Sequence, residues 1–342
     1  MGVARTALLC ASALLGLSGC ESMSGGGRPI TLAQLGLPDL YSGDAAARQP
    51  LRAEDLTRWW RRFDDPLLDA LVERESEAGP VASNKAGYQQ AMKRIATEAA
   101  IARSYVALRA RQAKIGNIRA DLATRQEDQE IARFREEAKL VTPLDALQAV
   151  AESDRIAATI PALEAGIAAD IAHIAVLTGQ APAALREQLA PAAPIPVGPA
   201  EVASGAPSDL LTRRPEVRLA ALRIGQARTW GGGTQAALAA YKEVVLRMME
   251  EAENARASFA SAKAREAALD KAVAEAGQLS AMARKQYREG TTDHVALQNA
   301  ERALLAVRNE RVDASADRAT ALIDLFTALG GSWEPEADGR RP

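Results

Sequence analysis

A seven-residue repeat of apolar and small residues, between residues 241 and 287, constrains the fold of this chain more than any other feature. Its positions alternate in steps of four and three, and only Glu266 and Ser280 interrupt the apolar or small series. This spacing places one stripe along a helix and winds that helix around a neighbour in a left-handed coiled coil. About 55 helical residues at about 1.5 Å each would reach roughly 80 Å, so the repeat predicts a rod. Its positions are Tyr241, Val245, Met248, Ala252, Ala255, Phe259, Ala262, Glu266, Leu269, Val273, Ala276, Ser280, Ala283 and Tyr287.

Helical patterns occur twice along the chain in the same order: a long helix, a short turn and a second helix. The long helices are expected over 88–139 and 234–288, and the second helices over 143–178 and 293–329. Helices joined by a short turn lie antiparallel. The sequence therefore predicts an all-α fold of long antiparallel coiled-coil helical hairpins in two repeats. The residues beside the two turns also correspond, Arg133-Phe134-Arg135-Glu136 with Gln286-Tyr287-Arg288-Glu289, and Leu147-Gln148 with Leu297-Gln298.

Proline, glycine and capping residues mark the ends of these segments. Thr142 is the expected N-cap of the helix that opens on Pro143, and Gly179 is its expected stop. The expected division is a signal peptide at 1–19, a lipidated tether at 20–50, a first hairpin repeat at 51–180, a Pro/Ala-rich connector at 181–208, a second hairpin repeat at 209–331 and a C-terminal tail at 332–342.

The N-terminus has the plan of a cleavable export signal followed by a lipidation site. A basic start at Arg5 precedes an apolar run, 6–19, that is too short for a permanent span, and Leu17-Ser18-Gly19-Cys20 closes it. Cleavage before Cys20 would leave this residue as a lipid-carrying N-terminus. The alternative is an ordinary secretory signal with an incidental cysteine. No second apolar run long enough to cross a membrane is expected, so lipid would be the only membrane attachment.

Composition argues against nucleic-acid binding and against catalysis. The formal charge is only −2, from 42 basic and 44 acidic residues, and no basic cluster stands out. The two histidines, His173 and His294, have no second imidazole or cysteine at metal-ligand spacing, and His294 is expected to be solvated beside a capping Asp293. We therefore expect no enzyme activity, no metal and no cofactor.

Several ordered motifs resemble one family, the TolC-like outer-membrane efflux factors, and within it the lipoprotein branch that serves RND-type multidrug pumps. The most specific is Leu210-Leu211-Thr212-Arg213-Arg214-Pro215-Glu216-Val217-Arg218. The segment from Trp59 and Trp60 through Phe63 to Leu68 is similar to that branch's N-terminal segment, and the closing segment, 328–334, completes the set. The family-motif residues expected to have structural roles are Trp59, Trp60, Phe63, Tyr105, Arg109, Arg213, Arg214, Pro215, Tyr241 and Tyr287.

The resemblance implies a homotrimer whose hairpins form a periplasmic tunnel. A periplasmic adaptor protein and an inner-membrane pump would be its partners, and the outer membrane would hold the lipid anchor. The two hairpin turns would dock the adaptor and line the closed aperture; the alternative is that they are plain turns without a partner. The first turn has Ala138 where the family usually has glycine. The turn residues are Glu137, Ala138, Lys139, Leu140, Val141 and Thr142, and then Glu289, Gly290, Thr291, Thr292 and Asp293.

Two further features have competing interpretations. Trp59 and Trp60 could form a binding patch, but packing of the N-terminal segment around the middle of the rod is favoured. The acidic residues Glu250, Glu251 and Glu253 are expected on a solvated helix face, with a tunnel-lining role as the alternative.

The chain departs from the family where each subunit would add strands to a shared β-barrel. Only 79–87 and 229–233 remain at the two insertion points, whereas one spanning strand needs about 9–11 residues. The barrel is therefore expected to be absent or vestigial. An engineered soluble tunnel, a natural barrel-less relative and a misjoined gene model are the three explanations. The alternative function is a non-conducting, coiled-coil structural or adaptor-binding lipoprotein.

Overall fold

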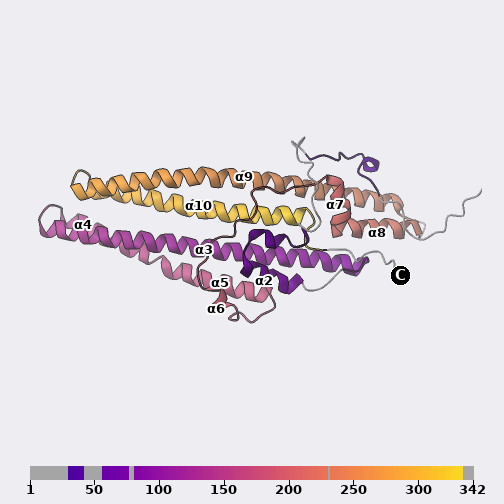
Figure 1. Ribbon diagram of the computed structural model, residues 1–342, viewed down its shortest axis with the longest axis horizontal. Coiled ribbons are helices and arrows are strands. Elements are labelled where there is room, and N and C mark those ends of the chain that lie inside the picture. Colours follow the sequence, from indigo (N-terminus) through magenta and orange to yellow (C-terminus); the bar gives the residue numbers. More distant parts are fainter. Residues whose placement is uncertain (1–29, 42–55, 77–80, 230–231, 334–342) are drawn as a thin grey trace, which may run out of the picture.

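The computed structural model describes residues 30–41, 56–76, 81–229 and 232–333. They form a rod in which two long helical hairpins lie lengthwise beside each other, with both hairpin turns at the same end (Figure 1). Within the described ranges all regular elements are helices, and Val81 is an isolated bridge residue rather than part of a strand. The predicted all-α fold of two coiled-coil hairpins is confirmed.

The first hairpin consists of α3 (Lys85–Glu137), α4 (Pro143–Ala157) and α5 (Ile160–Leu177). The expected single helix over 143–178 was wrong, because it is interrupted at Ala158 and Thr159. Pro161 causes the break, since it has no N–H to donate to the preceding turn. The hydroxyl of Thr159 donates to the carbonyl of Ile156 at 2.7 Å and closes the end of α4.

The second hairpin consists of α9 (Thr234–Glu289) and α10 (His294–Ala328). Every buried residue of α9 belongs to the predicted seven-residue series, and the remaining members of the series are half-buried. The predicted stripe is therefore confirmed. Helix α9 packs mainly on α10 and also on α8, and α10 packs on α3 as well and so joins the two hairpins.

Shorter elements pack on the rod from its middle to the end opposite the hairpin turns (Figure 1), and three of them open on a proline that suits a first helical turn. They are η1 (Ala33–Leu35), η2 (Trp59–Phe63), α2 (Pro66–Ser76), α6 (Arg186–Leu189), α7 (Pro207–Arg213) and α8 (Pro215–Thr229). The main apolar core lies here. Trp59 stacks on Phe326 of α10 with ring centroids 5.8 Å apart, and Trp60 is completely buried. Packing, rather than a binding patch, is therefore the role of the tryptophan pair.

The connector between the hairpins crosses α9 and α10 and is tied to both. Lys263 of α9 donates to the carbonyl of Ala200, and Arg318 of α10 donates to the carbonyl of Gly198. Gly198 lies so close to α10 that an added Cβ would stand 2.3 Å from a methyl group of Leu322. A larger residue at position 198 would therefore press against α10.

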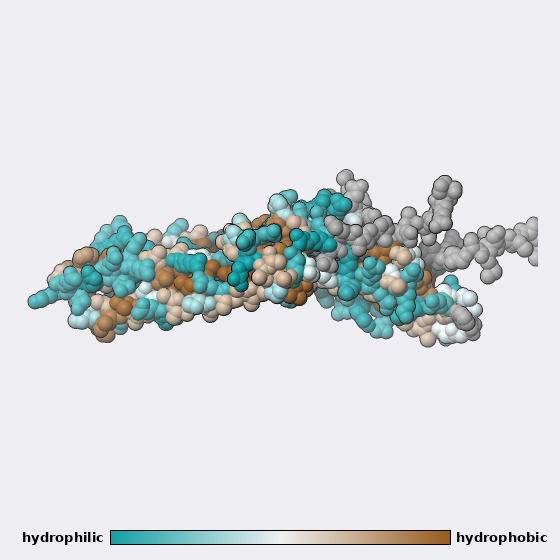
Figure 2. Space-filling view, turned by 90° about the horizontal axis from the view of Figure 1, so that it is seen from below, coloured by the Kyte–Doolittle hydropathy of each residue, from teal (hydrophilic) through white to brown (hydrophobic). Residues whose placement is uncertain are grey.

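Helix α5 is strongly apolar and only partly covered. By length and composition the stretch Pro143–Leu177 could cross a membrane, so the expectation that no such second run exists was wrong. Its acids nevertheless bind it to α3, because Asp170 accepts from Arg111 at 2.7 Å and Glu164 from Arg119 at 2.6 Å. The face on the side of α4 and α5 carries apolar patches along the rod (Figure 2).

Candidate functional site

The two hairpin turns end their long helices with the same hydrogen-bond pattern. In the first turn, Leu140 N–H donates to the carbonyl of Arg135 at 2.8 Å, and Lys139 has a left-handed backbone with φ 58°. In the second, Thr291 N–H donates to the carbonyl of Gln286 at 2.9 Å, and Gly290 has φ 76°. Lys139 therefore stands at the glycine position. The expectation that Ala138 replaces this glycine was wrong, because Ala138 has an ordinary right-handed φ of −77°.

Each second helix begins with a side-chain cap. Thr142 and Asp145 form a reciprocal capping box, and the hydrogen bonds from Thr142 hold the pKa of Asp145 below its usual value. Asp293 accepts from the N–H of Ala296 at 2.7 Å. The interval in sequence from Thr142 to Asp293 equals the interval from Lys139 to Gly290. This register pairs Leu297 with Ala146, so the sequence match of Leu147 with Leu297 was wrong by one residue.

Most of the predicted tip residues lie exposed at the end of the rod, whereas Val141 and Thr292 are half-buried. The expected exposed pair of Leu140 and Val141 is thus only partly confirmed. Apolar side chains nevertheless gather around the tips on both hairpins. They are Phe134, Leu140, Leu144, Leu147 and Val295, all more than half exposed.

The two tips are joined by Arg135 of α3. Its guanidinium donates to the carbonyl of Tyr287 in α9 at 2.8 Å and lies over the Tyr287 ring, 4.9 Å from the centroid. A cation–π contact and a hydrogen bond to a helix C-terminus are both attractive for an arginine side chain. Tyr287 is buried and its ring also lies 5.5 Å from that of His294.

His294 is buried, so the expectation of a solvated histidine was wrong. Its Nε2 lies 2.8 Å from Nε2 of Gln298, and burial lowers the pKa of the imidazole. His173, by contrast, is exposed on α5. Among the described residues, no group of three or more His, Cys, Asp or Glu side chains could hold a metal ion.

Below the tips, α3, α4, α9 and α10 enclose a cluster of charged side chains that the sequence analysis missed. Asp121, Arg125 and Asp128 come from α3, Glu152 from α4 and Glu301 from α10, and all five are buried. Arg284 from α9 reaches into the same cluster. On α3, the positions of Asp121, Arg125, Asp128 and the buried Ala132 are separated by alternating steps of four and three. Charged residues at the spacing of a buried stripe are therefore the sequence signal that could have identified this cluster.

Ion pairs connect the four helices through this cluster. Arg125 pairs with Asp121 at 2.7 Å within α3 and with Glu301 of α10 at 3.4 Å. Glu152 accepts from Arg155 and, across to α10, from Arg302 at 2.9 Å. These hydrogen bonds, led by the one from Arg155, lower the pKa of Glu152 to about 2. The cluster therefore fixes α4 and α10 to α3.

Asp128 has the opposite environment. Its side chain is buried, and burial together with the neighbouring Glu301 carboxyl raises its pKa to about 7. The pKa of Asp121 is also raised by burial, although Arg125 opposes the rise.

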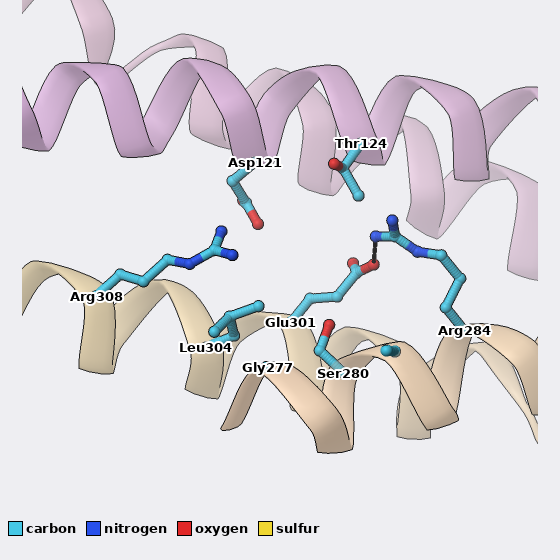
Figure 3. A pocket seen from close by; sticks show the side chains of 9 residues that line it. Asp121, Thr124, Gly277, Ser280, Arg284, Glu301, Leu304 and Arg308 are labelled. Carbon is cyan, nitrogen blue, oxygen red and sulfur yellow. Dashed lines mark hydrogen bonds and ion pairs between the residues drawn. The ribbon is translucent and has the colours of Figure 1, made fainter. Parts of the chain in front are cut away.

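A polar cavity of about 190 Å³ opens beside the cluster between α3, α9 and α10. Figure 3 shows Arg308 extending towards Asp121, and Arg284 directed at Glu301. A second, apolar hollow of about 300 Å³ lies between α9 and α10, lined by Leu279 and Met282 among others. Both side chains are more than half exposed.

The remaining family-motif residues hold the middle of the rod together. Tyr105 donates to Asp65 at 2.8 Å, and Arg109 stacks on the Tyr105 ring while donating to the carbonyl of Pro191 at 2.7 Å. These contacts fix α3 to the N-terminal segment and to the connector.

A similar set of contacts surrounds the start of α8. Arg214 donates to the carbonyl of Ala328 at 2.9 Å and to Glu251 at 2.7 Å, so Glu251 is paired as well as partly solvated. The indole of Trp333 donates to the carbonyl of Arg213. Pro215 opens α8 and is buried, as is Tyr241. Cys20 and the signal segment lie outside the described residues.

Comparison with solved structures defines the class of the fold. The outer-membrane channel OprN superposes with a TM-score of 0.75 at 20% identity, covering 87% of this chain and 98% of that chain. VceC from Vibrio cholerae superposes with a TM-score of 0.60 at 19% identity, covering 78% of this chain and 75% of that chain. The fold is that of the helical body of outer-membrane channel subunits.

Sequence comparison shows which proteins parts of this chain resemble. Residues 232–331 match the model for outer membrane efflux proteins. Nodulation protein T from Rhizobium leguminosarum bv. trifolii is 28% identical over 173 residues, 50% of this chain and 37% of that protein. OprJ from Pseudomonas aeruginosa is 30% identical over 98 residues, 29% of this chain and 20% of that protein. The matched regions thus span less than half of these relatives. Residues 232–331 are thus similar to outer membrane efflux proteins, and the fold is similar to that of solved outer-membrane channels.

Proposed function

We propose that this chain forms the periplasmic α-helical tunnel of a tripartite efflux system. Three copies would assemble into a passive conduit, docked through their hairpin tips to a periplasmic adaptor and through it to an RND-type inner-membrane pump. The observation that carries the proposal is the placement of both tips at one end of the rod, each with exposed apolar side chains. An exposed turn on a rigid helical pair can bind a partner with little reorganisation.

The assembly into trimers is supported by the uncovered apolar surface of the first hairpin. Helix α5 buries only Ile171, Ile174 and Ala175 in the single chain, although most of its residues are apolar. A soluble chain rarely leaves so much apolar surface uncovered. Lateral contact with neighbouring copies would cover this surface.

Membrane attachment forms part of the same proposal. A lipid on Cys20 would hold the rod at the outer membrane, facing the periplasm, with the segment 20–50 as tether, the hairpin repeats at 51–180 and 209–331, and the connector at 181–208. Such a lipid would tether the chain to one leaflet without crossing the membrane.

A binding measurement with matched variants tests the docking surface. Leu140→Glu places a charge on the first tip, whereas Val197→Glu places one on the similarly exposed connector far from the tips. We expect Leu140→Glu to weaken adaptor binding at least about tenfold, because an unpaired charge buried in an apolar contact is costly. Val197→Glu should bind like the unmodified chain. Equal effects of the two substitutions would contradict docking at the tips.

Complementation of a strain that lacks its outer-membrane channel tests conduction. Restored growth in drug would support the conduit. Adaptor binding without restored growth would favour the non-conducting, adaptor-binding lipoprotein instead.

A further inference from the structure

Asp128 and Glu301 meet at the boundary between the two hairpins. Asp128 lies on α3 and Glu301 on α10, and both carboxyl groups approach the same nitrogen, Nη2 of Arg284, at 3.5 Å and 2.5 Å. Each side chain is only 4% exposed. Two acids from different hairpins thus share one cationic partner away from water.

The cations around the pair are shared with other acids of the cluster. Arg125 reaches Glu301 but is also paired with Asp121 and approaches Glu152. Neither carboxyl oxygen of Asp128 has a hydrogen-bond partner among the described residues. A buried carboxylate without a donor is costly, whereas a protonated one next to a second carboxylate is not. The charged and titratable groups around the pair are Asp121, Arg125 and Glu127 from α3, Glu152 and Arg155 from α4, Arg284 and Arg288 from α9, and His294, Arg302 and Arg308 from α10.

We propose that Asp128 and Glu301 form a proton-dependent latch between the hairpins. With one proton on the pair, α3 and α10 stay together beneath the tips. When that proton is released to solvent, two buried carboxylates face each other and repel, and α3 separates from α10. Because Arg135 joins the same two hairpins at the tips, separation below would loosen the tips as well. The latch deepens the proposed function, since its consequence for efflux rests on the tips lining the aperture.

The direction of the pH effect follows from the shift of Asp128. Its pKa in the folded chain lies above that of the unfolded chain. The stability that protonated Asp128 gives the folded chain is therefore fully present below the unfolded pKa. It is lost as pH rises through about 7, the pKa in the folded chain. His294 has a lowered pKa, so its own contribution changes in the opposite direction, and a comparison of variants is needed to separate the two.

The test measures the separation of α3 and α10 in the full chain as a function of pH. Spin labels are placed on cysteines at the exposed Glu130 of α3 and Asn299 of α10, with Cys10 and Cys20 replaced by serine and excess unlabelled chain added. We expect the label distance to lengthen between about pH 5.5 and about pH 8.5. In Asp128→Asn, which cannot lose a proton, the distance should stay short throughout. A distance independent of pH, or one that lengthens equally in Asp128→Asn, would overturn the latch.

A matched control distinguishes the latch from any other acid between the same helices. Asp313 of α10 pairs with Lys114 of α3, but its side chain is 47% exposed. Asp313→Asn should keep the pH response of the unmodified chain. Glu301→Gln provides a second latch variant should Asp128→Asn fail to fold. The measurement uses neither adaptor nor pump. A negative result for the latch therefore does not change the docking and complementation tests, and negative results in those tests do not change the latch measurement.

Discussion

Lys139 adopts the left-handed backbone conformation that glycine adopts in the second hairpin. A side chain in this region is strained by roughly 1 kcal/mol relative to glycine. We predict that Lys139→Gly stabilises the chain by about 1 kcal/mol in urea unfolding followed by helical circular dichroism.

The neighbouring residue provides the control for this prediction. Ala138 is right-handed, so Ala138→Gly should destabilise by about 0.5–1 kcal/mol through backbone entropy alone. Stabilisation by Ala138→Gly together with no gain from Lys139→Gly would contradict the assignment of the left-handed position.

Glu152 makes the folded chain sensitive to acid. Its pKa in the folded chain is about 2, below the unfolded value of 4.5, so its stabilisation is present above pH 4.5 and is lost as pH falls towards 2. The contribution is on the order of 2–3 kcal/mol. We predict that Glu152→Gln flattens unfolding free energy against pH across this window, relative to the unmodified chain. Parallel curves for the two chains would show that Glu152 is not held ionised by Arg155 and Arg302.

Single residues also show where sequence reasoning ended. The apolar series of α9 identified its buried face correctly, because apolar residues at stripe spacing are favourable only when they are buried against another helix. Asp121, Arg125 and Asp128 have stripe spacing too, but charges are normally found in solvent, and only their partners on three other helices explain their burial. Such partners are far apart in sequence and become visible only in the fold.

At the scale of elements, the connector is fixed by close approach to α10. Gly198→Ala places a methyl group against Leu322 and Phe63, and overpacking of this kind costs about 1–3 kcal/mol. We predict that Gly198→Ala lowers the free energy of unfolding, measured in urea, by this amount. Gly225→Ala is the control, because it lies in α8 with open space around it and should stabilise by about 0.5–1 kcal/mol. Equal stability of Gly198→Ala and the unmodified chain would mean that the connector can move away from α10.

The helices themselves were largely predictable, because their ends carry local chemistry. Thr142, Pro143 and Gly290 placed both turns correctly. The interruption between α4 and α5 was missed, although Pro161 marks it in the sequence. A proline two residues into a helix is favourable as a start and unfavourable as an interior residue, and the pattern alone does not say which applies.

At the scale of the whole molecule, the apolar surface of α5 is where the proposed lateral contact between copies can be tested. Val176 is 59% exposed on this helix. We predict that Val176→Glu shifts the chain from trimer to single copies, because an unpaired charge in an apolar interface costs several kcal/mol. The unfolding midpoint of the dilute single chain should change little, since Val176 contacts solvent there. Native mass spectrometry of Val176→Glu and the unmodified chain at the same concentration measures the number of copies in each.

The copy number of the unmodified chain tests the central claim most directly, because one coiled-coil rod cannot enclose a tunnel. Native mass spectrometry of the full chain should give three copies as the main species. A main species of one or two copies at concentrations where the protein is fully folded would contradict the account of this chain as a tunnel subunit.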